Sequence, residues 1–309
     1  MSSYCHIFGP VPSRRLGSSL GLDLIPYKTC SFDCIYCQLG RTTCKTLERK
    51  EYVSVEEISK ELDSFLSNNP PAIDYVTLAG SGEPTLNTGF GRLIDLVKER
   101  TDKPVALLTN SSLLTDEKIR KDLSKADVIV PTLSSSSQEV FEKIHRSCPR
   151  IKAGEIITAL GSFVREYDTE VHLGVFMVAG YNDDEKSLMG LRDAVSEISP
   201  DYVEINTVTR PPAETYAKAV PLERLKEISG LLGGEVIRYH EREAKKGFSK
   251  DIEQALEDLL KRRPCTMKDI SEAMGIHMNE AAKYVQRLEA EGRIKRSEKM
   301  PDYYTAAEK

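Results

Sequence analysis

The chain has 309 residues, of which 40% are hydrophobic and 29% charged, and its formal net charge is −5. This length is enough for one large domain and a small one. The acidic balance argues against a surface that serves a polyanion as a whole. No apolar stretch approaches the roughly 18 residues of a membrane span, and the N-terminal residues lack the apolar core of a secretory signal. We therefore expect a cytoplasmic protein without a membrane partner.

Apolar runs and helical patterns alternate from residue 20 to about residue 237. The predicted strands are residues 19–24, 75–78, 105–109, 128–133, 171–178 and 202–207. The predicted helices are the stretch opened by the capping residue Ser54, residues 90–99 and 116–123, helical stretches to Tyr167, and residues 184–198 and 222–232. Six β-α units in series predict a parallel sheet that is covered by helices.

Chemistry in such folds lies at the carboxyl ends of the strands. Segments with glycine, polar or charged residues follow the predicted strands at residues 80–84, 110–112, 134–137, 180–183 and 210–214. Arg14 and Arg15, before the first strand, are candidates for binding a carboxylate or a phosphate. Arg210, after the sixth strand, is a candidate for binding the substrate or a carboxylate of the cofactor. The alternative for each arginine is a solvated surface charge.

The C-terminal part of the chain has a different pattern. We predict a core domain over residues 1–238, a charged linker over residues 239–250, and a winged-helix-like domain over residues 251–309. Its predicted helices are residues 251–261, 266–274 and 279–291, and a hairpin-like tail covers residues 293–304. Residues 250–309 contain 12 Lys and Arg and 12 Asp and Glu. This neutral balance favours a protein or peptide partner over nucleic acid, and the charged linker predicts few contacts between the two domains.

The seven cysteines include a cluster that points to metal chemistry. Cys30, Cys34 and Cys37 have the spacing C-x3-C-x2-C, and an odd, clustered set in a cytoplasmic chain favours metal or redox chemistry over disulfides. A cubane iron-sulfur cluster has four irons, so three cysteines leave one iron open to a small chelating ligand. The alternative is a structural zinc site with Cys44 or His6 as its fourth ligand, although such sites usually pair two C-x2-C units.

The triplet, with Tyr36 before its last cysteine, resembles the signature of the radical S-adenosylmethionine (SAM) superfamily. Residues 8–43, and also residues 131–133 and 206–214, are similar to the archaeal and bacterial members related to wyosine synthetase. The resemblance implies a partial (β/α)6 barrel, a [4Fe-4S] cluster on the triplet, and SAM as the chelating ligand. An electron donor such as ferredoxin or flavodoxin would reduce the cluster. The expected product is a 5′-deoxyadenosyl radical that abstracts hydrogen from a substrate.

The resemblance also implies which residues contact SAM. Residues 81–84 resemble the G-G-E-P motif, whose backbone meets the SAM amino group, with a serine in place of the first glycine. The expected cofactor-binding residues are Ser81, Gly82, Glu83, Pro84, Asn110 and Ser134. We expect Gly82 to leave space for the SAM amino group, because it lacks a side chain. Ser134 stands where relatives usually have an acidic residue for the ribose.

The sequence does not name the substrate. A protein or peptide is favoured because the tail is neutral, and a tRNA-modifying enzyme of the wyosine synthetase type is the first alternative. The second alternative is a winged-helix regulator that senses oxygen or iron through its cluster. Reductive cleavage of SAM would separate an enzyme from a sensor.

Overall fold

The computed structural model describes residues 4–13, 15–68, 72–209, 212–237, 250–262, 264–297 and 302–307. Arg14, Arg210 and all but the last residue of the predicted linker lie outside these residues. The positions of the two domain boundaries therefore stay predictions. Within the described residues, no helix is long and apolar enough to cross a membrane.

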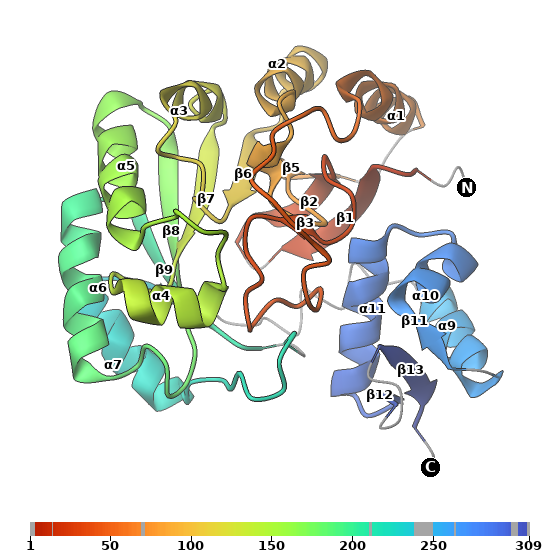
Figure 1. Cartoon of the computed structure of the whole chain (residues 1–309). Coiled ribbons are helices and arrows are strands. Elements are labelled where there is room, and N and C mark those ends of the chain that lie inside the picture. Colours follow the sequence, from red (N-terminus) through yellow and green to blue (C-terminus); the bar gives the residue numbers. More distant parts are fainter. Residues whose placement is uncertain are drawn as a thin grey trace.

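The core of the molecule is a curved eight-stranded sheet in the order β1-β2-β5-β6-β7-β8-β9-β10 (Figure 1). Its six central strands are those predicted, to within two residues: β2 (Gly17–Leu22), β5 (Tyr75–Leu78), β6 (Val105–Thr109), β7 (Val128–Leu133), β8 (Glu170–Met177) and β9 (Tyr202–Thr207). All five pairings between them are parallel, so the predicted parallel sheet is confirmed.

Two edge strands were not predicted. The first, β1 (Ile7–Ser13), pairs antiparallel with β2, and the short β10 (Glu235–Val236) extends the sheet beyond β9. The segment that forms β1 includes Gly9, Pro10 and Pro12, which weaken a strand pattern in the sequence. An edge strand tolerates proline because one row of its backbone groups needs no sheet partner.

In the described part of the barrel seven helices alternate with the strands, as expected for consecutive β-α units, and most of them cover the outer side of the sheet (Figure 1). They are α1 (Val55–Ser67), α2 (Phe90–Arg100), α3 (Glu117–Leu123), α4 (Gln138–His145), α5 (Ala153–Glu166), α6 (Glu185–Ile198) and α7 (Leu222–Leu232). Ser54 caps α1 as predicted, since its side chain accepts a hydrogen bond from the Glu57 N–H. The apolar helix faces and the strands share one continuous core.

The tail has the element order of a winged helix. It contains α9 (Lys250–Arg262), β11 (Cys265–Thr266), α10 (Met267–Met274), α11 (Met278–Ala290), β12 (Ile294–Arg296) and β13 (Tyr303–Ala306). Thr266 and Asp269 form a capping box at the start of α10, and Gly275 ends this helix in the left-handed conformation, as predicted. The tail has a hydrophobic core of its own, built around side chains such as Leu256 and Val285.

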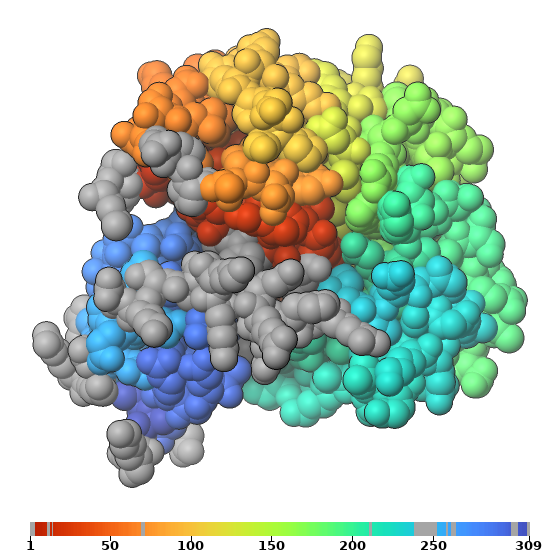
Figure 2. Space-filling view, turned by 180° about the vertical axis from the view of Figure 1, so that it is seen from behind, coloured from red at the N-terminus to blue at the C-terminus, as the bar shows by residue number. Residues whose placement is uncertain are grey.

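The tail and the barrel meet at a small set of side chains, mainly between α11 and β1. His277 precedes α11, and its Nε2 lies 3.1 Å from Oδ2 of Asp23, just after β2. Asn279 donates to the same oxygen at 3.4 Å, and Phe8 of β1 stacks on the His277 ring at 4.8 Å between centroids. Viewed from behind, the tail adjoins the barrel beside its N-terminal strands (Figure 2). The linker sequence gave no sign of these contacts because residues far from the linker make them.

Candidate cofactor site

The predicted cluster-binding cysteines lie in the long loop between β2 and α1, in the middle of the arc of strands (Figure 1). The loop is attached to the end of α4, since Asp33 N–H donates to the His145 carbonyl and Ile35 N–H donates to the Ile144 carbonyl, both at 2.9 Å. Within the loop, the short strand β3 (Thr29–Cys30) pairs with β4 (Cys44–Lys45). These backbone hydrogen bonds hold the loop against α4 and against itself.

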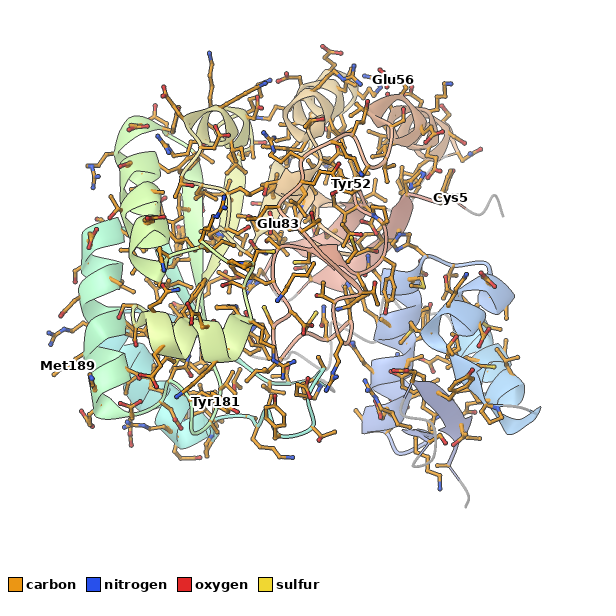
Figure 3. The ribbon with its side chains drawn as sticks, in the orientation of Figure 1. Cys5, Tyr52, Glu56, Glu83, Tyr181 and Met189 are labelled. Atoms are coloured by element: carbon orange, nitrogen blue, oxygen red, sulfur yellow. The ribbon has the colours of Figure 1, made fainter. Side chains whose placement is uncertain are left out.

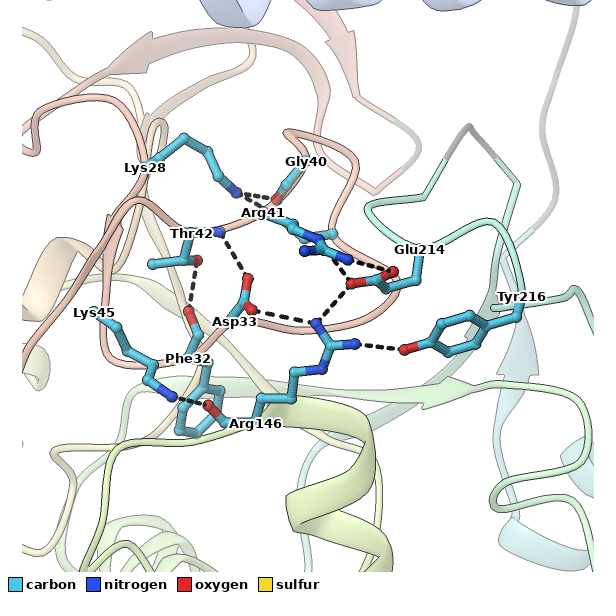
Figure 4. A network of polar contacts seen from close by, with 11 residues as sticks. Lys28, Phe32, Asp33, Gly40, Arg41, Thr42, Lys45, Arg146, Glu214 and Tyr216 are labelled. Carbon is cyan, nitrogen blue, oxygen red and sulfur yellow. Dashed lines mark hydrogen bonds and ion pairs between the residues drawn. The ribbon is translucent and has the colours of Figure 1, made fainter. Parts of the chain in front are cut away.

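A network of charged side chains holds the same loop from its outer side (Figure 4). Arg146, in the left-handed conformation at the end of α4, donates to Asp33 at 3.3 Å and to Glu214 at 2.7 Å, and it also contacts the Tyr216 hydroxyl. Arg41 donates to Glu214 at 3.2 Å. Although burial opposes ionisation of Glu214, hydrogen bonds from Arg146 and Arg41 hold the pKa of its carboxyl below its usual value. The network joins three segments: the cysteine loop, α4 and the loop after β9.

Each sulfur of the triplet has one side-chain nitrogen beside it. The pairs are Asn110 Nδ2 with Cys30 (3.5 Å), His145 Nδ1 with Cys34 (3.1 Å) and Lys28 Nζ with Cys37 (3.6 Å). Nitrogen donors and positive charge beside the sulfurs of an iron-sulfur cluster tune its reduction potential. Asn110 was predicted to contact SAM, and the structure places its side-chain amide against Cys30 and Ser31.

The thiols fit a cluster better than a single ion. Burial raises the pKa of Cys30 to about 12 and raises that of Cys34 well above its usual value, and both side chains line a cavity of about 310 Å3 together with Cys37. Bound iron would lower the pKa of both thiols, because a thiol that coordinates a metal loses its proton. No three His, Cys, Asp or Glu side chains of the described segments converge on a point where one ion could bind, as the zinc alternative requires. The three thiolates of a cubane bind separate irons and need not converge.

Two positions in the loop after β5 must be glycine, because neighbouring protein atoms occupy the space that a side chain would need. A Cβ on Gly82 would lie 1.7 Å from the carbonyl oxygen of Thr29, and one on Gly80 would lie 2.4 Å from the Asp23 carboxyl group. Ser81 donates to Asp23 through its backbone N–H, at 3.1 Å, and through its hydroxyl. The absence of a side chain at Gly82 is therefore required by the backbone of the cysteine loop, and its contact with SAM stays a prediction.

Glu83 lies in the interior of the barrel, where its carboxylate accepts hydrogen bonds from neighbouring segments (Figure 3). One carboxylate oxygen accepts from the hydroxyls of Thr85 and Thr109, at 2.6 and 2.7 Å, and the other accepts from the Asn110 N–H at 2.7 Å. Burial raises the pKa of this carboxyl group. Glu83 thus joins the loop after β5 to the end of β6, and Pro84 begins a buried 3-10 turn, η1 (Pro84–Leu86).

Ser134 does not line the cavity that the cysteines share. Its side chain is fully buried, and the hydroxyl of Tyr36 lies against it. Tyr36 in turn stacks on Phe176 of β8, with ring centroids 3.8 Å apart. Thr132, two residues earlier on β7, lines the cavity instead. Of the six predicted cofactor residues, only Ser81 and Gly82 line this cavity.

Several lining residues were missed by sequence reasoning. They are Lys28, Thr132, Phe176, Asn206 and Thr207. A polar residue within an apolar strand, as at Thr132 and Asn206, is a signal that could have found two of them, since inward-facing polar groups in a barrel commonly face a ligand. Nothing in the local sequence marks Phe176, whose position depends on the curvature of the sheet.

Arg15 is a partly buried residue beside the cysteine cavity. Its side chain is 19% exposed and pairs with Glu204 of β9, which also lies 3.4 Å from Nδ1 of His172. The surface-charge alternative for Arg15 is therefore wrong. Its guanidinium lines the cysteine cavity, where its charge is already balanced by a carboxylate.

Comparison with known proteins identifies the superfamily of this protein. Residues 24–191 match the family model of the Radical SAM superfamily, so the chain belongs to this superfamily of enzymes, whose members bind a [4Fe-4S] cluster and SAM. Residues 243–309 match the model described as the sugar-specific transcriptional regulator TrmB, which agrees with the winged-helix element order.

Two curated relatives are similar over most of the chain. A UPF0026 protein of Methanocaldococcus jannaschii is 35% identical over 225 residues, which cover 72% of this chain and 70% of that protein. A protein of Brachyspira hyodysenteriae named GTPase Obg is 35% identical over 294 residues, which cover 94% of this chain. The chain spans only 43% of the length of that second relative.

Solved structures share the fold. TYW1 with a bound lysine-pyruvate adduct matches with a TM-score of 0.53 and 13% identity, over 73% of this chain and 75% of that chain. SuiB of Streptococcus suis, bound to the precursor peptide SuiA, matches with a TM-score of 0.55 and 17% identity, over 78% of this chain and 55% of that one. The predicted radical SAM fold is thereby confirmed.

We expect Lys28→Met to shift the reduction potential of the cluster to a more negative value. The variant removes the buried cation beside Cys37, and a cation there stabilises the reduced, more negatively charged cluster. A redox titration of the reconstituted protein, followed by electron paramagnetic resonance, measures this shift. Lys60→Met, at an exposed position on α1, is the control. Equal potentials in wild type and Lys28→Met would show that Lys28 holds the cysteine loop in place but does not affect the reduction potential of the cluster.

Proposed function

We propose that this chain cleaves SAM reductively at a [4Fe-4S] cluster bound by Cys30, Cys34 and Cys37, and that the substrate is a protein or peptide. The observation that carries the proposal is the single cavity that the three thiols share with Ser81 and Gly82. A chelating ligand on the open iron would lie in this cavity, beside the loop after β5. The electron comes from a donor such as ferredoxin or flavodoxin.

Cys30, Cys34 and Cys37 would hold the cluster, and the bound cluster would supply the electron for cleavage of the bond between sulfur and C5′ of SAM. The products of this chemistry would be methionine and, after one hydrogen atom is taken from the substrate, 5′-deoxyadenosine. The residues of this chain orient the reactants and exclude water. Thr132 and Asn206 replace Ser134 as candidates for contacts with the ribose, because they line the cavity and Ser134 does not.

The test uses the full chain, reconstituted anaerobically with iron and sulfide and then reduced with dithionite in the presence of SAM. We expect methionine and 5′-deoxyadenosine to form in equal amounts, slowly, even without substrate. Chromatography with mass spectrometry measures both products. A protein that holds its cluster but leaves SAM intact would refute the enzyme and favour the regulator that senses oxygen or iron.

The substrate class needs a separate experiment. SuiB, which shares this fold, binds the precursor peptide SuiA, so a peptide is one substrate class that this fold can serve. The neutral tail supports the peptide. Mass spectrometry of proteins and of tRNA from cells with and without this gene distinguishes the two. A modified nucleoside that disappears with the gene would favour the wyosine-type alternative.

A further inference from the structure

Asp23, directly after β2, carries a carboxylate that the barrel and the tail share. Its side chain is only 5% exposed. Oδ1 accepts hydrogen bonds from the backbone N–H groups of Ile25 and Ser81, at 3.2 and 3.1 Å. Oδ2 accepts from the Ser81 hydroxyl and, at 3.4 Å, from the Asn279 side chain, and it lies 3.1 Å from Nε2 of His277. A buried carboxylate needs such donors, because its burial without them is unfavourable.

The His277 ring has one nitrogen directed to the tail and one directed to the barrel. Nδ1 accepts a hydrogen bond from the Asn279 N–H at 3.1 Å and thereby caps α11. An imidazole that accepts at Nδ1 carries its proton on Nε2, so Nε2 is the donor to Asp23. Phe8 of β1 stacks on the ring at an interplanar angle of 19°. The cap and the stacking together fix the direction of this donor.

The loop that Asp23 holds presents backbone groups to the cysteine cavity. Ser81 is bound on two sides, since Asp23 accepts from its N–H and hydroxyl, and its carbonyl accepts from the Lys28 N–H at 2.7 Å. Gly80 and Gly82 flank Ser81, and both line the cysteine cavity. No described group donates a hydrogen bond to their carbonyl oxygens. Free carbonyl oxygens can accept from an ammonium group, such as the one on the methionine part of SAM.

The two donors from the tail determine which way the Asp23 carboxylate can turn. With His277 and Asn279 both at Oδ2, the carboxylate has one orientation, and so have the groups of Ser81 that donate to it. Without them, Oδ2 would turn toward water in the space that the tail leaves, and its hold on Ser81 would weaken. A loop that is free to move binds its ligand more weakly, because binding must then order the loop.

We propose that Asp23 is a positioning residue for SAM and that His277 and Asn279 of the tail hold it in place. This inference rests on the proposed function and gives the tail a part in cofactor binding. The tail acts through Asp23 on Ser81, and through Ser81 on the backbone that borders the cysteine cavity. A chain that loses these contacts binds SAM more weakly, although the three cysteines that hold the cluster belong to the barrel.

The test compares two substitutions of His277 in the full chain, reconstituted anaerobically with iron and sulfide. Both His277→Gln and His277→Phe lose the imidazole that caps α11. Glutamine keeps a nitrogen donor at the same number of bonds from Cα as Nε2, whereas phenylalanine keeps a ring that stacks on Phe8. Anaerobic calorimetric titration measures the affinity for SAM. We expect His277→Phe to bind SAM about tenfold more weakly, as for one lost hydrogen bond to a carboxylate, and His277→Gln to stay within about threefold of the wild type.

A second substitution tests the path through Ser81. Ser81→Ala removes the hydroxyl that Asp23 holds. In the Ser81→Ala chain, His277→Phe should therefore weaken SAM binding by about threefold at most, which is less than in the wild-type chain. Lys268→Met, at an exposed position on α10, is the control for a changed tail residue and should bind SAM like the wild type. Iron content and melting temperature are measured for every variant, so that affinities are compared between folded, loaded proteins.

The outcomes separate a positioning role from a structural one. Equal weakening in His277→Phe and His277→Gln, or the larger loss in His277→Gln, would show that the ring only supports the fold of the tail, and would overturn the proposal. Unchanged affinity in His277→Phe, or full additivity with Ser81→Ala, would overturn it too. Loss of iron in His277→Phe would assign the tail to the cysteine loop instead. If the wild type holds its cluster and binds no SAM, the proposed function itself fails.

Discussion

Alanine at Cys30, Cys34 or Cys37 should abolish the cluster. Wild-type protein reconstituted under anaerobic conditions should bind about four irons per chain and absorb at about 400 nm, as a thiolate-ligated cubane does. Each variant leaves one iron of the cubane without its thiolate. Iron analysis and absorption spectroscopy measure the loss.

Cys148→Ala is the matched control for the triplet. Cys148 is buried near the same loop, and its backbone N–H donates to the Ser31 carbonyl at 2.9 Å, a bond that alanine keeps. This variant should bind iron like the wild type. Cys44→Ala should do so too, whereas the zinc alternative predicts that it loses its metal. Full iron retention in the triple variant of Cys30, Cys34 and Cys37 would disprove the site.

Gly82→Ala should weaken SAM binding by about tenfold or more, and Gly82→Val by a larger factor. The new Cβ would meet the carbonyl oxygen of Thr29 at 1.7 Å, and a backbone atom cannot turn away as a flexible side chain can. The loop after β5 and the cysteine loop must then separate, and such overpacking costs about 1–3 kcal/mol. Because Thr29 precedes Cys30, we expect reduced iron content as well. Anaerobic calorimetric titration with SAM measures the affinity.

Gly230→Ala controls for the loss of a glycine. A Cβ on Gly230, in α7, meets no atom within 4 Å, so this variant should bind SAM and iron normally. Unchanged SAM affinity in Gly82→Ala would remove the loop from the cofactor site. A loss of affinity without any loss of iron would instead locate the effect at the SAM contact itself.

The strands and the cysteine triplet could be predicted because their signals are local. Continuous apolar runs such as residues 128–133 predict strands that are buried on both faces, and β7 is such a strand. The spacing of Cys30, Cys34 and Cys37 places three thiols on one short loop, whatever the rest of the chain does. The caps Ser54 and Thr266 were also predictable, because a cap acts on backbone groups two or three residues away.

The cofactor residues were harder to predict because their surroundings come from distant segments. The sequence places Ser134 at the end of a strand, but its burial depends on the stacking of Tyr36 on Phe176. Gly82 was predicted to face a ligand, and only the folded chain puts the Thr29 carbonyl in that space. Each case is decided by which segment fills the space next to a residue, and local patterns carry no information on that.

The sequence by itself determined the class of cofactor and the alternation of strands and helices, since both depend on residue types at short spacing. Only the tertiary structure decided that Asp23 connects the tail to the loop after β5, through Asn279 and Ser81. The contact between Asp23 and Asn279 joins residues 256 positions apart in the chain. Such a contact forms because two independently folded surfaces are complementary, and complementarity is a property of surfaces that only folding creates.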